Sequence, residues 1–167
     1  PEIRTVEHLA VILDETGGRG GGSRGYAPAA AEAWEEAREE LASFRRLAVG
    51  AETAEAFVAL QPVLDQRWRQ RWLAGGRPEK GRPRAAQERI GPFDREGPYD
   101  PAFLAGAFTL PEVGALSEPV GTAFGWHLLF LREVSPARDD PFEAAADEIR
   151  ERAEPGIEAQ RAAGFVR

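Results

Sequence analysis

The two histidines of the chain, His8 and His127, constrain its fold most strongly, because each lies inside a nearly continuous apolar run. These runs, residues 5–13 and 125–131, predict strands that are buried on both faces. A buried neutral imidazole needs hydrogen-bond partners for both of its ring nitrogens. The strands are therefore predicted to be neighbours whose histidines bond to each other. Two separate core histidines, each with its own partners, fit the positions equally well.

The segments between the two runs alternate between helical and strand patterns. Apolar residues recur at helical spacing over 34–47, Thr53 can cap a second helix, and Asp100 or Pro101 can start a third. Shorter strands are predicted at 90–93 and 119–122. The order predicts an α+β domain over residues 1–134, in which helices pack around a small four-stranded sheet of antiparallel or mixed strands. The pattern from Asp140 predicts a helical tail over 135–167.

Charge is distributed unevenly along the chain. The net charge is −7, yet residues 66–89 hold eight basic and two acidic residues. We interpret this segment as a basic insert, which is a solvated loop, a lid or a docking site for a protein partner. Two tryptophans one helical turn apart, Trp68 and Trp72, favour packing against this domain or against a partner. The acidic remainder opposes nucleic-acid binding, and no apolar run is long enough to span a membrane.

The sequence segments around the histidines resemble those of the parvulin family of peptidyl-prolyl cis/trans isomerases. The first strand reads V-E-H-L-A-V-I-L. Residues 103–110 read F-L-A-G-A-F-T-L, and residues 116–127 read L-S-E-P-V-G-T-A-F-G-W-H. The similarity extends over most of residues 4–134 and is strongest at the two ends. It implies a parvulin-like fold, proline-containing polypeptides as substrates, and catalysis of X–Pro rotation without covalent chemistry or a cofactor.

The resemblance also implies site residues. His8 and His127 match the paired histidines at the floor of the family's active site, and Thr122 matches the hydroxyl residue beside them. The positions that match the apolar proline pocket are Ile90, Phe93, Tyr99, Phe103 and Phe124. The family usually places an Asp or Cys facing the histidine pair. The matching position falls close to Arg67, so Asp65 is the nearest acid and the predicted catalytic partner.

Several other functions remain open at this point. A parvulin fold with weak or no catalysis would act as a chaperone or docking module, and bacterial members of this kind are often parts of extracytoplasmic, including periplasmic, foldases. Arg19 and Arg24 lie in a Gly-rich loop that resembles the phosphate-binding loop of phospho-specific parvulins. A zinc site would need ligands beyond the two histidines, and the chain has no cysteine, so no metal is expected.

Overall fold

The computed structural model describes residues 1–15 and 31–136. Within them the elements follow the order β1 (Ile3–Ile12), α1 (Ala31–Ala48), α2 (Ala54–Val58), α3 (Gln61–Ala74), β2 (Ala85–Phe93), α4 (Pro101–Phe108), β3 (Val120–Gly121) and β4 (Gly125–Ser135). The chain divides into two compact units, Pro1–Pro136 and Ala137–Arg167. The predicted tail helix from Asp140 and the loop arginines Arg19 and Arg24 lie outside the described residues.

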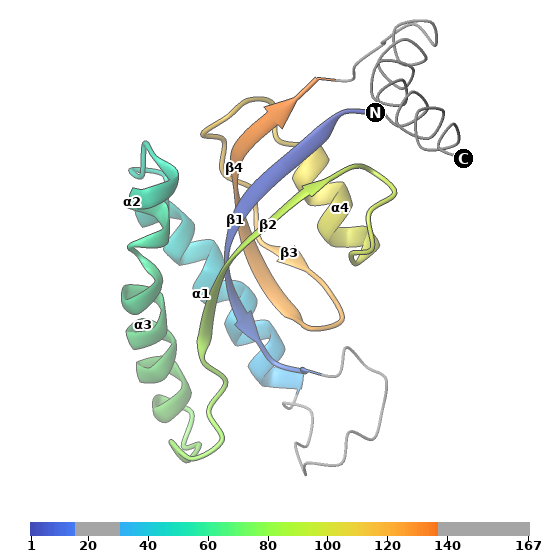
Figure 1. The fold of residues 1–167 in the computed structure, drawn as a ribbon. Coiled ribbons are helices and arrows are strands. Elements are labelled where there is room, and N and C mark those ends of the chain that lie inside the picture. Colours follow the sequence, from blue (N-terminus) through green and yellow to red (C-terminus); the bar gives the residue numbers. More distant parts are fainter. Residues whose placement is uncertain (16–30, 137–167) are drawn as a thin grey trace, which may run out of the picture. The chain divides into compact units, whose positions relative to one another are not determined.

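The four described strands form one antiparallel sheet in the order β2-β1-β4-β3. The two apolar runs are the central strands β1 and β4, and the shorter, more polar β2 and β3 are the edges (Figure 1). This arrangement confirms the predicted α+β class with a four-stranded sheet. It follows from burial, because a central strand between two covered faces must be apolar on both sides.

Alternate residues of β1 face two different layers, as the pleat of a strand requires. On one face Leu9 belongs to a core formed with α1, α2 and α3, which includes Leu41, Phe44 and Phe57. On the other face Val6 belongs to a core formed with α4, which includes Phe103 and Phe108. Figure 1 shows α1, α2 and α3 on one side of the sheet and α4 on the other.

Two capping residues start helices at the predicted positions. The Thr53 side chain accepts a hydrogen bond from Ala56 N, 3.1 Å away, at the start of α2. Asp100 accepts one from Ala102 N at 2.8 Å and opens α4, with Pro101 in the first turn. Each cap satisfies a backbone N–H that would otherwise lack a partner. The Asp100 cap also fixes the end of α4 that lies beside the histidines.

The predicted basic insert at 66–89 is part of the domain's regular structure. Its first part continues α3, and its last part is the edge strand β2. Trp68 is fully buried and Trp72 nearly so, and their indole N–H groups donate to the carbonyl oxygens of Pro83 and Pro78, both at 2.8 Å. The tryptophans therefore pack against this domain.

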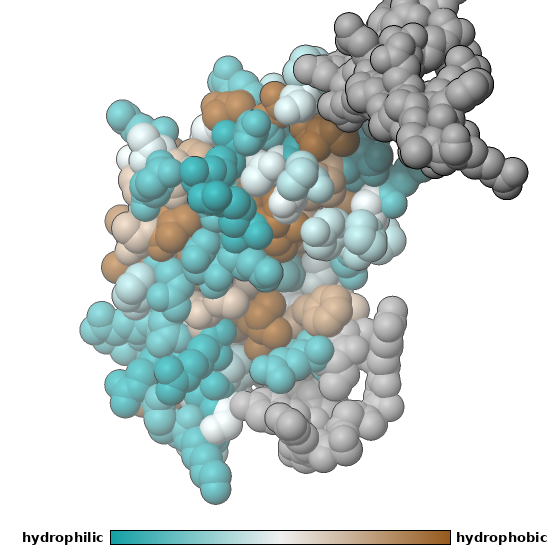
Figure 2. Space-filling view, viewed as in Figure 1, coloured by the Kyte–Doolittle hydropathy of each residue, from teal (hydrophilic) through white to brown (hydrophobic). Residues whose placement is uncertain are grey.

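Three arginines of this segment pair with acidic residues on α1. Arg77 forms two hydrogen bonds of 2.8 Å with Glu36, Arg67 donates to Glu40 at 2.6 Å, and Arg71 pairs with Glu39 and Glu40. Figure 2 shows the resulting hydrophilic surface over α3. The sequence's charge asymmetry thus reflects an acidic helix packed beside a basic one, and the features that suggested a partner are used within the fold.

Candidate active site

The histidines of β1 and β4 lie side by side on the α4 face of the sheet. His8 Nδ1 and His127 Nδ1 are 3.2 Å apart, and the rings are stacked with their centroids 5.2 Å apart. In the strand register His8 lies opposite Leu129 and His127 opposite Ala10, so the rings meet on a diagonal. The predicted contact between the two histidines is confirmed.

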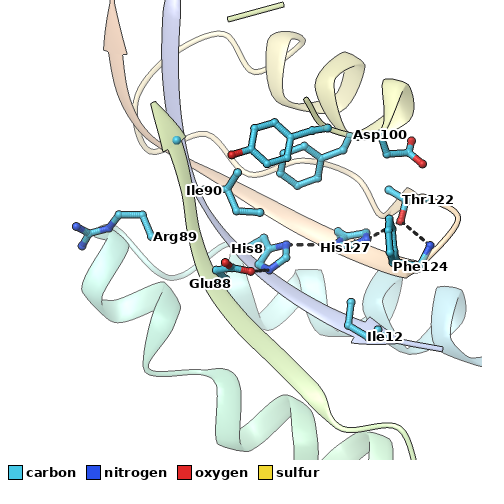
Figure 3. A pocket seen from close by; sticks show the side chains of 12 residues that line it. His8, Ile12, Glu88, Arg89, Ile90, Asp100, Thr122, Phe124 and His127 are labelled. Carbon is cyan, nitrogen blue, oxygen red and sulfur yellow. Dashed lines mark hydrogen bonds and ion pairs between the residues drawn. The ribbon is translucent and has the colours of Figure 1, made fainter. Parts of the chain in front are cut away.

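A chain of polar groups extends from this pair in both directions. The Thr122 hydroxyl is 2.8 Å from His127 Nε2, and a carboxylate oxygen of Glu88 is 4.0 Å from His8 Nε2 (Figure 3). Only one hydrogen fits between the two facing Nδ1 atoms when both rings are neutral. The Glu88 charge favours the arrangement in which His8 carries its hydrogen on Nε2 and accepts from His127, whose Nε2 then accepts from Thr122.

Both histidines are held neutral by burial. Desolvation lowers the pKa of His8 to about 4, against a smaller opposing effect of the Glu7 charge. Desolvation lowers the pKa of His127 to about 3, with a further contribution from His8, while Asp100 opposes the shift. Each of the two residues is only about one-twentieth exposed, and burial of this degree explains the lowered pKa values. At neutral pH the floor of the site therefore carries no charge.

An apolar wall rises over this floor and encloses a cavity of about 380 Å³. Its apolar and aromatic lining comes from five different elements or turns and consists of Ile12, Ile90, Tyr99, Phe103 and Phe124. Phe103 meets both imidazoles edge-on, with centroid distances of 6.2 and 5.9 Å. Tyr99 and Phe124 are about two-fifths exposed and stand at the mouth. Figure 2 shows apolar surface between β2 and the turn joining β3 to β4.

The comparisons with known proteins identify the family of this chain. A family model described as the PPIC-type PPIASE domain matches residues 27–147, most of the chain. The chain belongs to this family of peptidyl-prolyl isomerases. No curated protein matches the sequence.

Among solved structures the chain is similar to a peptidylprolyl isomerase (PrsA) from Bacillus anthracis, with 20% identity and a TM-score of 0.39. The alignment covers 93% of this chain and 51% of the other, so the chain spans about half the length of that structure.

Of the residues expected from the family resemblance, seven line the cavity: His8, His127, Thr122, Ile90, Tyr99, Phe103 and Phe124. Phe93 stands one layer behind, almost fully buried, where its ring contacts Tyr99, Phe103 and Phe108. It supports the aromatic wall instead of forming its surface. The family pattern therefore indicated residues that the structure brings together around one cavity.

Asp65 is not among the residues that the structure brings to the histidine pair. It lies on α3, where its two oxygens accept hydrogen bonds from Arg82 at 3.0 and 3.2 Å and one also accepts from Ala85 N at 2.9 Å. Desolvation alone would raise the pKa of this carboxyl, but these hydrogen bonds and the Arg82 charge hold it below its usual range. Asp65 joins α3 to the start of β2, so the expectation that it faces the histidines is corrected.

Two acids that were not predicted line the cavity instead, Glu88 on β2 and Asp100 at the start of α4. Glu88 stands directly opposite His8 in the antiparallel register. Asp100 caps α4 with one oxygen, and its other oxygen accepts from Ala123 N at 3.3 Å, which links α4 to the β3–β4 turn. The sequence signal for Asp100 was its place before Pro101. For Glu88 the signal was the strand pairing, which a single sequence does not give.

No group of three or more His, Cys, Asp or Glu side chains within residues 1–15 and 31–136 is arranged to hold a metal ion. In the same ranges no helix is both long and apolar enough to cross a membrane.

Proposed function

We propose that this domain accelerates cis/trans isomerisation of X–Pro bonds in polypeptides by binding the proline ring in the apolar cavity above the histidine pair. The observation that carries the proposal is the combination of an aromatic wall and an uncharged polar floor. The aromatic rings of Tyr99, Phe103 and Phe124 offer the apolar faces, and the linked imidazoles of His8 and His127 close the base. Family membership supports the same reaction.

The proposed catalysis follows from the electronic structure of the amide. Resonance gives the C–N bond partial double-bond character and a rotation barrier of about 18–20 kcal/mol. The planar ground state is charge-separated, whereas the twisted transition state has lost resonance and is less polar. A cavity that removes water from the bond destabilises the planar form relative to the twisted one, which is the differential binding that catalysis requires. The low pKa values of His8 and His127 suit this role, because a charged floor would oppose it.

The proposal is tested by a protease-free isomerisation assay on proline peptides with wild-type protein, Phe124→Ala and Leu47→Ala. Phe124 is 41% and Leu47 is 47% exposed, so truncation of either is expected to change stability little. Phe124 lines the cavity, whereas Leu47 lies on α1 at the other face of the sheet. We expect Phe124→Ala to lower kcat/KM about tenfold, or about 1.4 kcal/mol, with Leu47→Ala unchanged. Equal activity of all three proteins, or no acceleration by the wild type, would refute the proposal.

A second candidate function is a chaperone or docking module with weak catalysis. The observation that favours it is the position of Asp65. Its carboxylate accepts hydrogen bonds from Arg82 and from Ala85 N and does not line the cavity above the histidines. Suppression of client aggregation that a short proline peptide does not compete away would support this alternative. Competition by the peptide would place client binding in the cavity and favour the isomerase.

The proposed clients are proline-containing polypeptides outside the cytoplasm, as in the bacterial foldases that the sequence resembles. Fractionation of cells that express the natural protein tests the location: recovery with cytoplasmic markers would contradict it.

A further inference from the structure

We propose that the cavity selects prolines that have a basic residue, Lys or Arg, directly before or after them in the chain. For turnover this inference rests on the proposed isomerase function, whereas for binding it stands independently. It is carried by the two carboxylates that flank the histidine pair, Glu88 and Asp100.

The two carboxylates stand on different sides of the histidine pair, as Figure 3 shows. Glu88 lies next to His8, with a side chain that is 70% exposed and so accessible to a bound polypeptide. Asp100 lies nearer Thr122 and is held by the backbone N–H groups of Ala102 and Ala123. Hydrogen bonds from neutral amides fix the position of the Asp100 carboxylate without neutralising its charge.

Among the described residues that line the cavity, Arg89 is the basic one, and its guanidinium points away. Successive residues of a strand face opposite sides of a sheet, so Arg89 leaves β2 on the side opposite Glu88 (Figure 3). There it donates to the buried carboxylate of Glu7 at 2.9 Å. The histidines are kept uncharged by burial. The described wall thus carries two negative charges that no cation within the cavity balances.

A client whose proline ring occupies the cavity brings its neighbouring side chains to these two acids. Because Glu88 and Asp100 stand on different sides of the ring site, one can face the residue before proline and the other the residue after it. A basic side chain whose charge lies about 6 Å from a carboxylate in a water-rich environment binds about threefold more tightly than a neutral one, and an acidic side chain binds about threefold more weakly. The difference between a basic and an acidic neighbour is therefore about tenfold in affinity at low ionic strength.

Another feature of the sequence supports the opposite hypothesis, a preference for an acidic residue beside the proline. Arg19 and Arg24, in the Gly-rich loop that resembles a phosphate-binding loop, would favour a phosphorylated or acidic residue before proline. Both arginines lie outside the described residues. The two hypotheses predict opposite orders for the same set of peptides, so one experiment separates them.

The experiment uses the full chain and peptides that differ only beside the proline. The residue before it is Lys, Leu, Glu or phosphoserine, and a second series places Lys, Leu or Glu after it. Dissociation constants are measured by calorimetry and kcat/KM by the protease-free assay, each at low salt and at 0.5 M salt. We expect the order Lys, Leu, Glu in both series, a Lys-to-Glu ratio of about tenfold, and a smaller ratio at high salt.

Three variants assign the preference to its residues. Glu88→Gln and Asp100→Asn remove one charge each at nearly constant shape, and Asn retains the ability to cap α4. Each is expected to reduce the Lys-to-Glu ratio from about tenfold to near one in one of the two peptide series. Glu88→Lys is expected to reverse the order in that series. Glu112→Gln, on an exposed loop residue outside the cavity, is the matched control and leaves the ratio unchanged.

The outcomes separate this inference from the proposed function. Isomerisation without a charge preference, or with Glu or phosphoserine preferred, overturns the inference and leaves the isomerase. Tighter binding of Lys peptides without acceleration supports the inference and overturns the isomerase. Absence of both binding and acceleration overturns both.

Discussion

Glu7 and His8 are neighbours in one buried strand, and the two faces of the sheet treat them in opposite ways. Glu7 is 1% exposed, and its carboxylate takes hydrogen bonds from Gln87 at 3.0 Å, Arg89 at 2.9 Å and Arg132 at 3.0 Å. His8 is 5% exposed, and its ring bonds to another histidine. One face stabilises a charged group by pairing it, and the other keeps its polar group uncharged.

This difference indicates where the function lies. A buried carboxylate needs charged and hydrogen-bonding partners, and Glu7 has them, so the hollow on that face is lined mainly by polar side chains that pair with one another. The histidine face leaves an open apolar cavity above the neutral rings. A network of paired polar groups holds strands in register, whereas an uncharged polar floor beneath an apolar cavity is suited to binding a ligand.

The largest effect that tests this comparison is expected from Glu7→Gln. The change leaves Arg89 and Arg132 without their shared charge partner. Removing one member of a buried ion pair typically costs 3–5 kcal/mol. Because these two arginines are partly exposed, we expect a loss of about 2 kcal/mol in the free energy of unfolding, measured in urea. Isomerisation of a Leu–Pro peptide is expected to be unchanged per folded molecule, because Glu7 lies outside the cavity.

A result in which Glu7→Gln lowered kcat/KM as strongly as Phe124→Ala would remove the functional distinction between the two faces. Glu133→Gln, at an exposed position on β4, is the control for loss of one carboxylate. It should change neither the free energy of unfolding nor kcat/KM.

A smaller effect is expected from pH, and it concerns His8. In the unfolded chain a histidine has a pKa of about 6.5, whereas burial lowers the pKa of His8 to about 4. Below pH 6.5 the unfolded state therefore binds a proton that the native state does not, so stability falls as pH falls. At pH 5.5, one unit below the unfolded value, the cost is about 1.4 kcal/mol.

The contribution of His8 to the pH dependence of the free energy of unfolding is measured by urea unfolding of the wild type and His8→Gln at pH 7.5 and 5.5. The carboxylates around the site, Glu7, Glu88 and Asp100, are present in both proteins, so their contributions largely cancel in the difference. The wild type is expected to lose about 1.4 kcal/mol more than the variant over this interval. An equal loss in both proteins would show that His8 is solvated and would contradict its neutral state in the fold.

The sequence predicted the features that depend on the apolar pattern and missed those that depend on register and side-chain choice. The central strands, the histidine contact and the cap at Asp100 follow from local pattern and from the partners that buried polar groups need. The contact between Glu88 and His8 depends on the pairing of β2 with β1, which no local signal encodes. The arginines of α3 looked like an exposed patch because their acidic partners on α1 are some 30 residues earlier in the chain.

The error about Asp65 has a related physical cause. Asp65 was expected near the histidines because it is the acid nearest to the family position close to Arg67. A helical residue can face any of several neighbours, however, and a nearby guanidinium decides between them. Arg82, whose side chain is only 4% exposed, needs an anion, and Asp65 is the acid within its reach on α3. The ion pair with the buried Arg82 guanidinium thus accounts for the position of the Asp65 carboxylate.

The smallest effect, and the one that tests this correction, is expected from Asp65→Asn. The amide keeps an oxygen for Ala85 N but loses the charge that pairs with Arg82. Because Arg82 also contacts Glu79 at 3.2 Å, part of the pairing survives, and we expect unfolding in urea to show a loss of about 1 kcal/mol. The kcat/KM of the folded protein should equal that of the wild type. A large fall in kcat/KM at unchanged stability would mean that Asp65 reaches the histidines in the working enzyme, and that the polar network on its face of the sheet is not purely structural.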